Sequence, residues 1–263
     1  MPHVELFRGD VGDPDDLDEA LEGVKAVIHL VGIIVATRDQ SFERAHVVGT
    51  KMLLEATARA GVRRYVHMSA LGVEGGRGLS EYYRTKWVAE EAVRASDIET
   101  TVFRPSIIFG PGDDFVNQLA RVIRLSPVVP LPGGGTTRFQ PIWVGDVAEC
   151  FLQAACMGST PERIYEVGGP QIVSLREIVI QLADAMGRRR KTVAVPIGPL
   201  RVGAAIAERV LPRSPLTRDQ LAMLARDNTA EPESVARLLH DFEIEHAGLR
   251  DKMPGWLIAR SAR

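Results

Sequence analysis

The chain has 263 residues, of which 45% are hydrophobic and 25% charged, with a formal net charge of −2. A chain of this length can bury a sizeable core, as one large domain or as a domain with a subdomain. The charge balance gives no electrostatic case for binding nucleic acid, although Arg188–Lys191 is a local basic run. That run is more typical of a solvated helix end than of a phosphate or lipid-headgroup site.

The cysteines and the hydropathy pattern indicate the compartment in which the protein is found. Cys150 and Cys156 are the only cysteines and form no Cys-x-x-Cys pair, so the sequence predicts no metal site and two buried thiols in a reducing compartment. An acidic stretch, 10–22, follows Met1 almost at once, and no run approaches 18 uninterrupted apolar residues. We therefore expect a cytoplasmic protein, with peripheral membrane association left open.

The first half alternates short apolar, β-branched runs with helical patterns, which predicts parallel strands joined by crossover helices. Asp13-Pro14 has the chemistry of a helix start and Gly61 that of a helix end. The expected strands are 4–8, 25–31, 63–68 and 100–108, and the expected helices are 14–22, 40–60 and 80–95.

The second half is less regular. Its expected elements are a helix at 114–125, a glycine loop at 133–135, a helix at 147–157, a strand at 164–167, a helix at 174–186 capped by Ser174 and Glu177, a strand at 192–195 and a helical tail at 196–263. Within that tail, 200–211 is an apolar helix that bears Arg201, Glu208 and Arg209. Its pattern favours a core helix over a lipid-binding face.

A tyrosine and a lysine stand four residues apart at Tyr82 and Lys86, a spacing that places both side chains on one face of a helix. An ammonium beside a phenol favours the phenolate, and it would lower the tyrosine pKa from about 10 towards the working pH. Ser69 lies thirteen residues before Tyr82, at the end of an apolar run. A surface Tyr-Lys pair is the competing interpretation, and the neighbouring motifs decide against it.

Five segments occur in one order: Gly9–Asp13, Val27–Gly32, Gly49–Ala56, Arg63–Gly72 and Arg104–Asp113. Together they resemble the extended and atypical short-chain dehydrogenase/reductases. The segments His67–Val147 and Tyr165–Asn228 resemble, more narrowly, the branch related to the nucleotide-binding accessory subunit of respiratory complex I.

The resemblance implies an α/β fold, a Rossmann-like parallel sheet with a small mixed carboxyl-terminal cap. Residues 1–168 would form the core, with a cap insertion at about 113–140, and residues 169–263 the cap. Family members open with a strand, a Gly-x-x-Gly-x-x-Gly turn that holds the cofactor pyrophosphate, and a helix. Here the amino end looks instead like the family's third strand, so we expect an incomplete gene model that lacks the first βαβ unit. The 263-residue chain alone is expected to bind NAD(P) weakly.

The resemblance also assigns roles to individual residues. The catalytic group would be Ser69, Tyr82 and Lys86, with Tyr83 as a packing residue. The cofactor-binding residues would be Asp10, Val11, Leu30, Val31, Gly32, Lys86, Pro105, Ser106 and Ile107. Arg138 and Gln140 are candidates for contacting substrate. The family's fourth catalytic position, an asparagine, is His46 here, which leaves the full proton relay open.

Two functions remain as hypotheses. One is an NAD(P)-dependent oxidoreductase or epimerase/dehydratase relative with a small-molecule substrate. The other is a non-catalytic, nucleotide-binding accessory or assembly factor for a respiratory or quinone-synthesis complex. The choice between NAD and NADP stays open, because the strand end that reads the ribose 2′ position is not in the sequence.

Overall fold

The computed structural model describes residues 4–37, 39–210 and 216–253, and these form two compact units. Unit 1 takes in the described residues of 1–69, 73–103 and 153–164. Unit 2 takes in those of 70–72, 104–152 and 165–263. Both predicted cap segments, 113–140 and 169–263, fall in unit 2.

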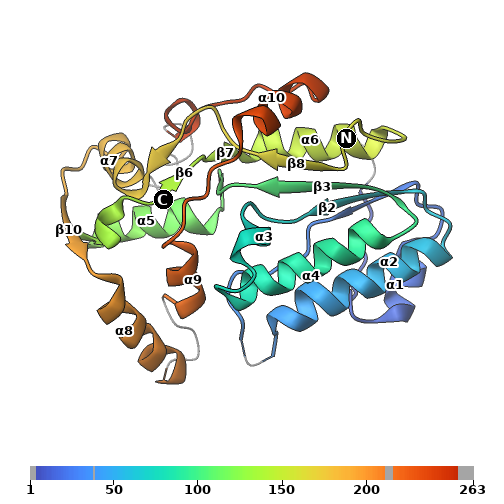
Figure 1. Cartoon of the computed structure of the whole chain (residues 1–263), viewed down its shortest axis with the longest axis horizontal. Coiled ribbons are helices and arrows are strands. Elements are labelled where there is room, and N and C mark those ends of the chain that lie inside the picture. The colour runs from blue at the N-terminus through green and yellow to red at the C-terminus, as the bar shows by residue number, and fades with distance from the viewer. Residues whose placement is uncertain (1–3, 38, 211–215, 254–263) are drawn as a thin grey trace. The chain divides into compact units, whose positions relative to one another are not determined.

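Unit 1 is built from parallel strands joined by helices (Figure 1). Its elements are α1 (Pro14–Ala20), β1 (Ala26–His29), the π-helix η1 (Glu43–Val48), α2 (Gly49–Arg59), β2 (Arg64–Met68), α3 (Val73–Gly76), α4 (Glu81–Ala95) and most of β3 (Glu99–Pro105). The strand order is β1-β2-β3-β8, and only Ile164 of β8 (Ile164–Val167) belongs to unit 1. The predicted α/β fold with a parallel sheet is confirmed.

Helices α1, α2 and α4 cover one face of the unit 1 sheet (Figure 1). The shared core lies between them, and burial of such apolar side chains is the main force that holds the layer together. Its members include Leu17 and Leu21 from α1, Leu53 and Leu54 from α2, Val93 from α4, and Val27, Tyr65 and Val102 from the strands.

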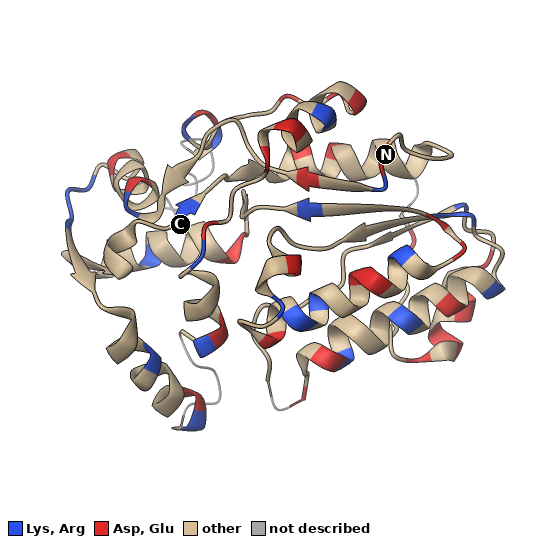
Figure 2. Ribbon diagram, in the orientation of Figure 1, with Lys and Arg blue, Asp and Glu red and all other residues tan. Residues whose placement is uncertain are grey.

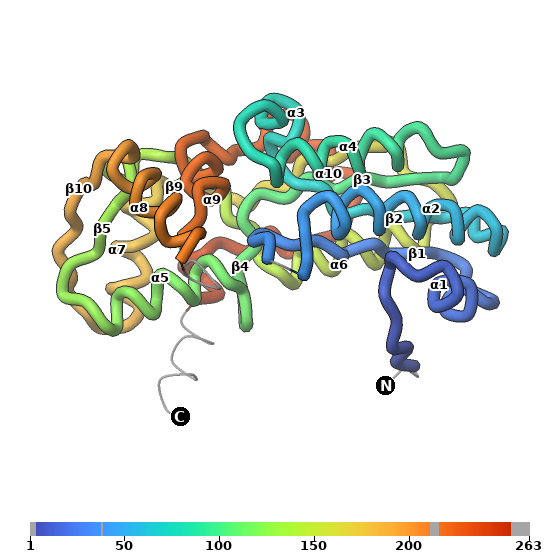
Figure 3. The backbone as a smooth tube through the Cα atoms, turned by 90° about the horizontal axis from the view of Figure 1, so that it is seen from below, coloured from blue at the N-terminus to red at the C-terminus, as the bar shows by residue number. Residues whose placement is uncertain are grey.

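The predicted strand at 4–8 is wrong. Residues 4–10 carry no strand, and Val4, Leu6 and Phe7 are 79%, 90% and 52% exposed. Figure 3 shows this segment leading to the amino end without joining the sheet. A strand is stable only where a neighbour takes up its hydrogen bonds, and β1 pairs only with β2 among the described residues.

Unit 2 holds a separate core with three short two-stranded sheets. Its elements are β4 (Ile108–Phe109), α5 (Asp114–Leu125), β5 (Val128–Pro132), the 3₁₀ turn η2 (Gly133–Gly135), β6 (Arg138–Phe139), β7 (Ile142–Trp143), most of α6 (Val144–Cys156), β9 (Val173–Ser174), α7 (Leu175–Ala185), β10 (Lys191–Val195), α8 (Ile197–Val210), α9 (Arg218–Met223) and α10 (Pro232–Asp241). Strand β10 pairs with β5 and β4 with β7 in parallel, whereas β6 and β9 are antiparallel.

Several predicted elements of unit 2 are confirmed. Helices α5 and α7 fall at the expected positions, and Ser174 and Glu177 form the expected capping box at the start of α7. The tail is helical in α8, α9 and α10, and its residues 211–215 and 254–263 lie outside the described residues. No helix in the described part of the chain is both long and apolar enough to cross a membrane.

Candidate functional site

Two strand ends and one helix of unit 1 build the candidate site. Strands β1 and β2 pair in parallel with His29 opposite His67, so the segments that follow them leave the sheet at the same edge. Helix α4 begins after Ser80, whose hydroxyl accepts a hydrogen bond from the Tyr83 backbone N–H. The start of α4 thereby fixes the positions of Tyr82 and Lys86 relative to that edge.

Lys86 joins the helix to both strand ends. Its ammonium is buried and donates to the Met68 carbonyl, at the end of β2, over 2.7 Å. A Cβ on Gly32, after β1, would lie 3.2 Å from Lys86 Nζ, so the glycine lets the backbone lie directly against the ammonium. Burial lowers the Lys86 pKa from 10.5 to about 8, while the nearby Glu90 carboxylate acts in the opposite direction.

The hydrogen-bond partner of Ser69 is Glu90, a residue that was not predicted from the sequence. The Ser69 hydroxyl donates to Glu90 Oε2 over 2.6 Å, and both side chains are buried. Glu90 follows Lys86 by four residues, so Tyr82, Lys86 and Glu90 form one row along α4. The repeated spacing of four was the signal that could have identified this carboxylate.

Tyr82 lies in an aromatic cluster. Its ring packs edge-on against His46, Phe42 and Tyr83, at centroid distances of 5.5, 6.1 and 5.6 Å. Burial raises the Tyr82 pKa above its usual value of 10, and the Tyr83 phenol acts in the same direction. The expected lowering of this pKa is therefore wrong in this structure, because desolvation dominates.

His46 holds α4 to the segment after β1. Its Nε2 accepts from the Ile33 backbone N–H over 3.0 Å, and its Nδ1 lies 2.9 Å from Thr85 Oγ1. Nε2 also lies 3.1 Å from the Ile33 carbonyl oxygen, and the Thr85 hydroxyl donates to the Glu81 carbonyl. Burial and the Lys86 charge lower the His46 pKa to about 3, so the ring is a neutral tether.

A second histidine pair lies beneath the site. His29 and His67 are buried with ring centroids 5.1 Å apart, and the Tyr65 hydroxyl lies 2.7 Å from His29 Nδ1. Among the described residues, Nε2 of each ring has no hydrogen-bond partner. Burial and the Lys86 charge lower the pKa of both, to about 3 for His29. These imidazoles, which sequence reasoning missed, are neutral.

The other predicted cofactor residues of unit 1 are spread more widely. The Asp10 carboxylate is exposed and forms an ion pair with Arg44 at 3.0 Å. Val11 packs against the backbone of Gly49, where a Cβ would lie 2.8 Å from Val11 Cγ2. Leu30 and Val31 are exposed. Gly32 alone of these five lies against Lys86.

The predicted site residues of unit 2 serve largely to hold the chain together. The Ser106 hydroxyl donates to the Asn228 side-chain and backbone oxygens, and Gln140 bonds the backbone of Gly169 and Ala230. Gln140 is buried with both ends of its amide used, so its interpretation as a substrate contact is wrong in this structure. Pro105 accepts from the Leu71 backbone N–H, and Ile107 packs on the unit 2 core.

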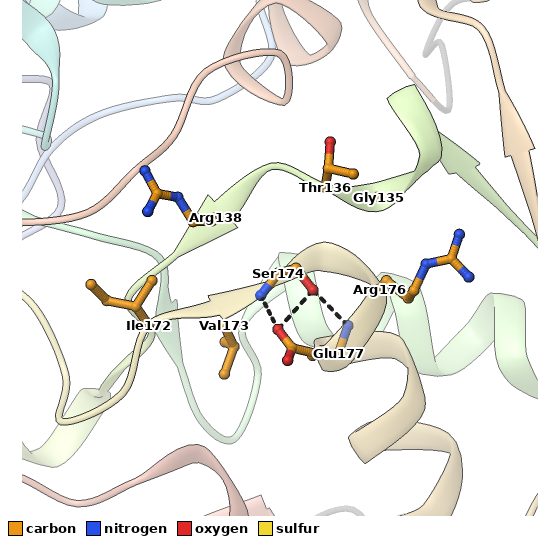
Figure 4. Close-up of a pocket in the computed structure, with 8 residues that line it drawn as sticks. All are labelled: Gly135, Thr136, Arg138, Ile172, Val173, Ser174, Arg176 and Glu177. Carbon is orange, nitrogen blue, oxygen red and sulfur yellow. Dashed lines mark hydrogen bonds between the residues drawn. The ribbon is translucent and has the colours of Figure 1, made fainter.

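Arg138 borders a pocket of about 300 Å³ in unit 2 (Figure 4). The pocket is lined by Gly135, Thr136, Arg138, Ile172, Val173, Ser174, Arg176 and Glu177. The Arg138 guanidinium and backbone N–H both bond the Asp227 carboxylate, and Arg176 donates to the Gly134 carbonyl and to Thr192. Both arginine side chains at this pocket therefore already form hydrogen bonds within the protein, and the Arg138 charge is paired with that of Asp227.

Comparison with known proteins supplies the cofactor class. Residues 1–116 match the family described as NAD(P)H-binding. The segment Leu30–Gly32 and Lys86 lie together at this edge, since a Cβ on Gly32 would lie 3.2 Å from Lys86 Nζ.

Two curated relatives and one solved structure extend this result beyond the NAD(P)H-binding domain. The chain is 33% identical over 198 residues to NADH dehydrogenase (ubiquinone) 1 alpha subcomplex subunit 9 of Arabidopsis thaliana mitochondria, covering 74% of this chain and 49% of that protein. It is 33% identical over 211 residues to ceramide reductase of Caulobacter vibrioides, covering 77% and 63%. MoeE5 in complex with UDP-glucuronic acid and NAD has the same fold, with a TM-score of 0.71 at 24% identity over 96% of this chain and 85% of that chain.

The resemblance to short-chain dehydrogenase/reductases and to the complex I accessory branch is thereby confirmed. The chain spans about half of the length of the Arabidopsis relative and less than two thirds of the length of the Caulobacter relative.

Proposed function

We propose that this chain acts as an NAD(P)-dependent oxidoreductase in which Tyr82 transfers the proton. The observation that carries the proposal is the meeting of Lys86 with both strand ends, through the Met68 carbonyl and the backbone of Gly32. That junction sets the tyrosine helix against the edge of a parallel sheet where dinucleotides bind in such folds. The named activity of the Caulobacter relative, a reductase, is of the same class.

Each side chain of the site would have a separate role in the reaction. A bound nicotinamide would give or take the hydride. Tyr82 would exchange a proton with the reacting oxygen of the substrate. Lys86 would give up its hydrogen bond to the Met68 carbonyl, hold the cofactor ribose and favour the phenolate form of Tyr82. Ser69 would fix the substrate oxygen while Glu90 holds its hydroxyl. The substrate is a small molecule with a carbonyl or a secondary hydroxyl group.

The test is turnover by the full-length protein, with NADH or NADPH, against a panel of ketones and secondary alcohols. Tyr82→Phe should lower turnover by about 10²- to 10⁴-fold, as for loss of a general acid or base, with cofactor affinity nearly unchanged. Tyr83→Phe is the matched control, because Tyr83 packs against Gly76 and stands three residues before Lys86. Equal turnover by wild type and Tyr82→Phe would remove the mechanism.

A second function is favoured by a different observation, the 33% identity to a complex I subunit. On this proposal the protein acts in the cytoplasm as a nucleotide-binding accessory factor for a respiratory or quinone-synthesis complex at the membrane face. Its binding of NAD(P) would stabilise the fold rather than support turnover. It predicts a cofactor-dependent rise in melting temperature with no turnover of any substrate, and equal co-purification of partner with wild type and Tyr82→Phe.

A further inference from the structure

Helix α8 exposes an apolar face in place of the core contact expected for it. Of its 14 residues only Ala204 is buried, so the interpretation of this helix as core is wrong. Val202, Ile206 and Val210 are 63%, 59% and 72% exposed. Their spacing of four aligns them along one side of the helix, which we call the α8 stripe.

The charges beside the α8 stripe are basic. Arg201 and Arg209 are both exposed, and neither guanidinium has an ion-pair partner within the described part of the chain. The one acidic residue of the helix, Glu208, is bound by the Arg218 side chain and backbone, each at 2.7 Å. Figure 2 shows α8 as a mostly uncharged helix with basic positions along it. The outer surface of α8 thus combines aliphatic side chains with unneutralised positive charge.

We propose that the α8 stripe docks on the surface of an anionic lipid bilayer. The helix is about 21 Å long at 1.5 Å per residue, shorter than the roughly 30 Å hydrocarbon layer, so it would lie in the interface and not span it. Apolar side chains in the acyl boundary with arginines at the phosphate level are the features of interfacial helices. This inference does not depend on the proposed enzymatic activity.

The composition of the stripe argues against a protein partner or a second copy. Specific protein interfaces bury about 800 Å² on each side and are enriched in aromatic residues and methionine. The stripe offers three aliphatic side chains and no aromatic one. Binding to a bilayer requires less buried apolar area, because shallow insertion and attraction to anionic headgroups act together.

The test is co-sedimentation of the full-length protein with vesicles of phosphatidylcholine alone and of phosphatidylcholine with one quarter phosphatidylglycerol. Wild type should sediment with the anionic vesicles, and less so as salt is raised, because salt screens the arginines. The triple variant Val202→Ser, Ile206→Ser, Val210→Ser should bind about tenfold more weakly or worse. Arg201→Gln and Arg209→Gln should each weaken binding about fivefold.

Matched controls distinguish docking through the α8 stripe from non-specific binding of exposed apolar residues to vesicles. Ile180 on α7 and Leu239 on α10 are 45% and 41% exposed, and their serine variants should sediment as wild type does. All variants should keep the wild-type circular dichroism spectrum, because the changed side chains are exposed. Absence of vesicle binding by wild type, equal binding by the α8 variants, or loss of a dimer in the triple variant would overturn the proposal.

Discussion

The Ser69 hydroxyl donates to Glu90 Oε2 over 2.6 Å inside unit 1, where both side chains are excluded from solvent. The hydrogen of Ser69 is committed to this carboxylate, so its oxygen is left as an acceptor. A substrate hydroxyl or the Tyr82 phenol could donate to that oxygen, whereas a substrate carbonyl could not receive from it until the hydroxyl rotates. On the proposed function, Glu90 would thereby restrict Ser69 to accepting a hydrogen bond from a substrate hydroxyl.

Glu90→Gln should destabilise the protein. The change removes a buried negative charge that supports the buried Lys86 ammonium, and breaking such an arrangement costs about 3 kcal/mol. The free energy of unfolding in urea, measured at pH 7, checks the loss. Glu91→Gln is the control, because Glu91 is the next residue on α4 and is exposed, and it should change stability by less than about 0.5 kcal/mol.

The local part of this site was predictable from sequence and the long-range part was not. Tyr82 and Lys86 follow from helical spacing, which depends only on neighbouring residues. Glu90 shares that spacing, but its partner Ser69 lies 21 residues earlier in the chain, and nothing in the local pattern records the contact.

The errors have the same origin. The Gln140 side chain accepts a hydrogen bond from the Ala230 backbone N–H, 90 residues away. The composition of the loop around Gln140 cannot indicate this contact. The segment 4–8 was expected to be a strand because it looks like the family's third strand, but a strand also needs a neighbour, and sequence pattern carries no information on pairing. Core burial of α8 was predicted from its apolar content, which cannot distinguish a buried face from an exposed one.

Gly32→Ala should disturb the contact between the strand end and Lys86. The added Cβ would lie 3.2 Å from Lys86 Nζ and 3.6 Å from His46 Nε2, so the lysine ammonium must give way by a few tenths of an ångström. We expect a stability loss of about 1 kcal/mol by urea unfolding. Gly78→Ala is the control: a Cβ there meets nothing within 4 Å, and alanine should be neutral or slightly stabilising. Equal effects at both positions would contradict the proposed close approach.

The buried histidines should make the protein sensitive to mild acid. His29 and His46 have folded pKa values of about 3 against about 6.5 unfolded, so between these values the unfolded chain binds more protons. The contribution of these two histidines to stability is therefore full above pH 6.5 and is lost as the pH decreases towards 3. His46→Asn, which restores the family residue, should show a shallower decrease in urea midpoint from pH 6.5 to 4.5. Parallel pH profiles for variant and wild type would show that His46 does not titrate in this way.

Lys86 should give a dependence of the same direction at alkaline pH. Its folded pKa of about 8 lies below the unfolded value of 10.5, so between the two the unfolded chain retains a proton that the folded chain has released. Its contribution to stability therefore rises from pH 8 to 10.5 and is constant below pH 8. The stability of wild type relative to Lys86→Met should rise over this range, by at most about 1.4 kcal/mol for each pH unit.

The control for that measurement is Lys51→Met, at an exposed position on α2, which should leave the alkaline profile of wild type unchanged. At pH 7 Lys86→Met should itself be destabilising, because the Met68 carbonyl loses its donor and Glu90 loses the nearby cation. A wild-type advantage over Lys86→Met that stays constant from pH 8 to 10.5 would mean that Lys86 keeps its proton throughout. On the proposed function, the buried ammonium would then be a fixed charge beside the phenolate and the cofactor ribose.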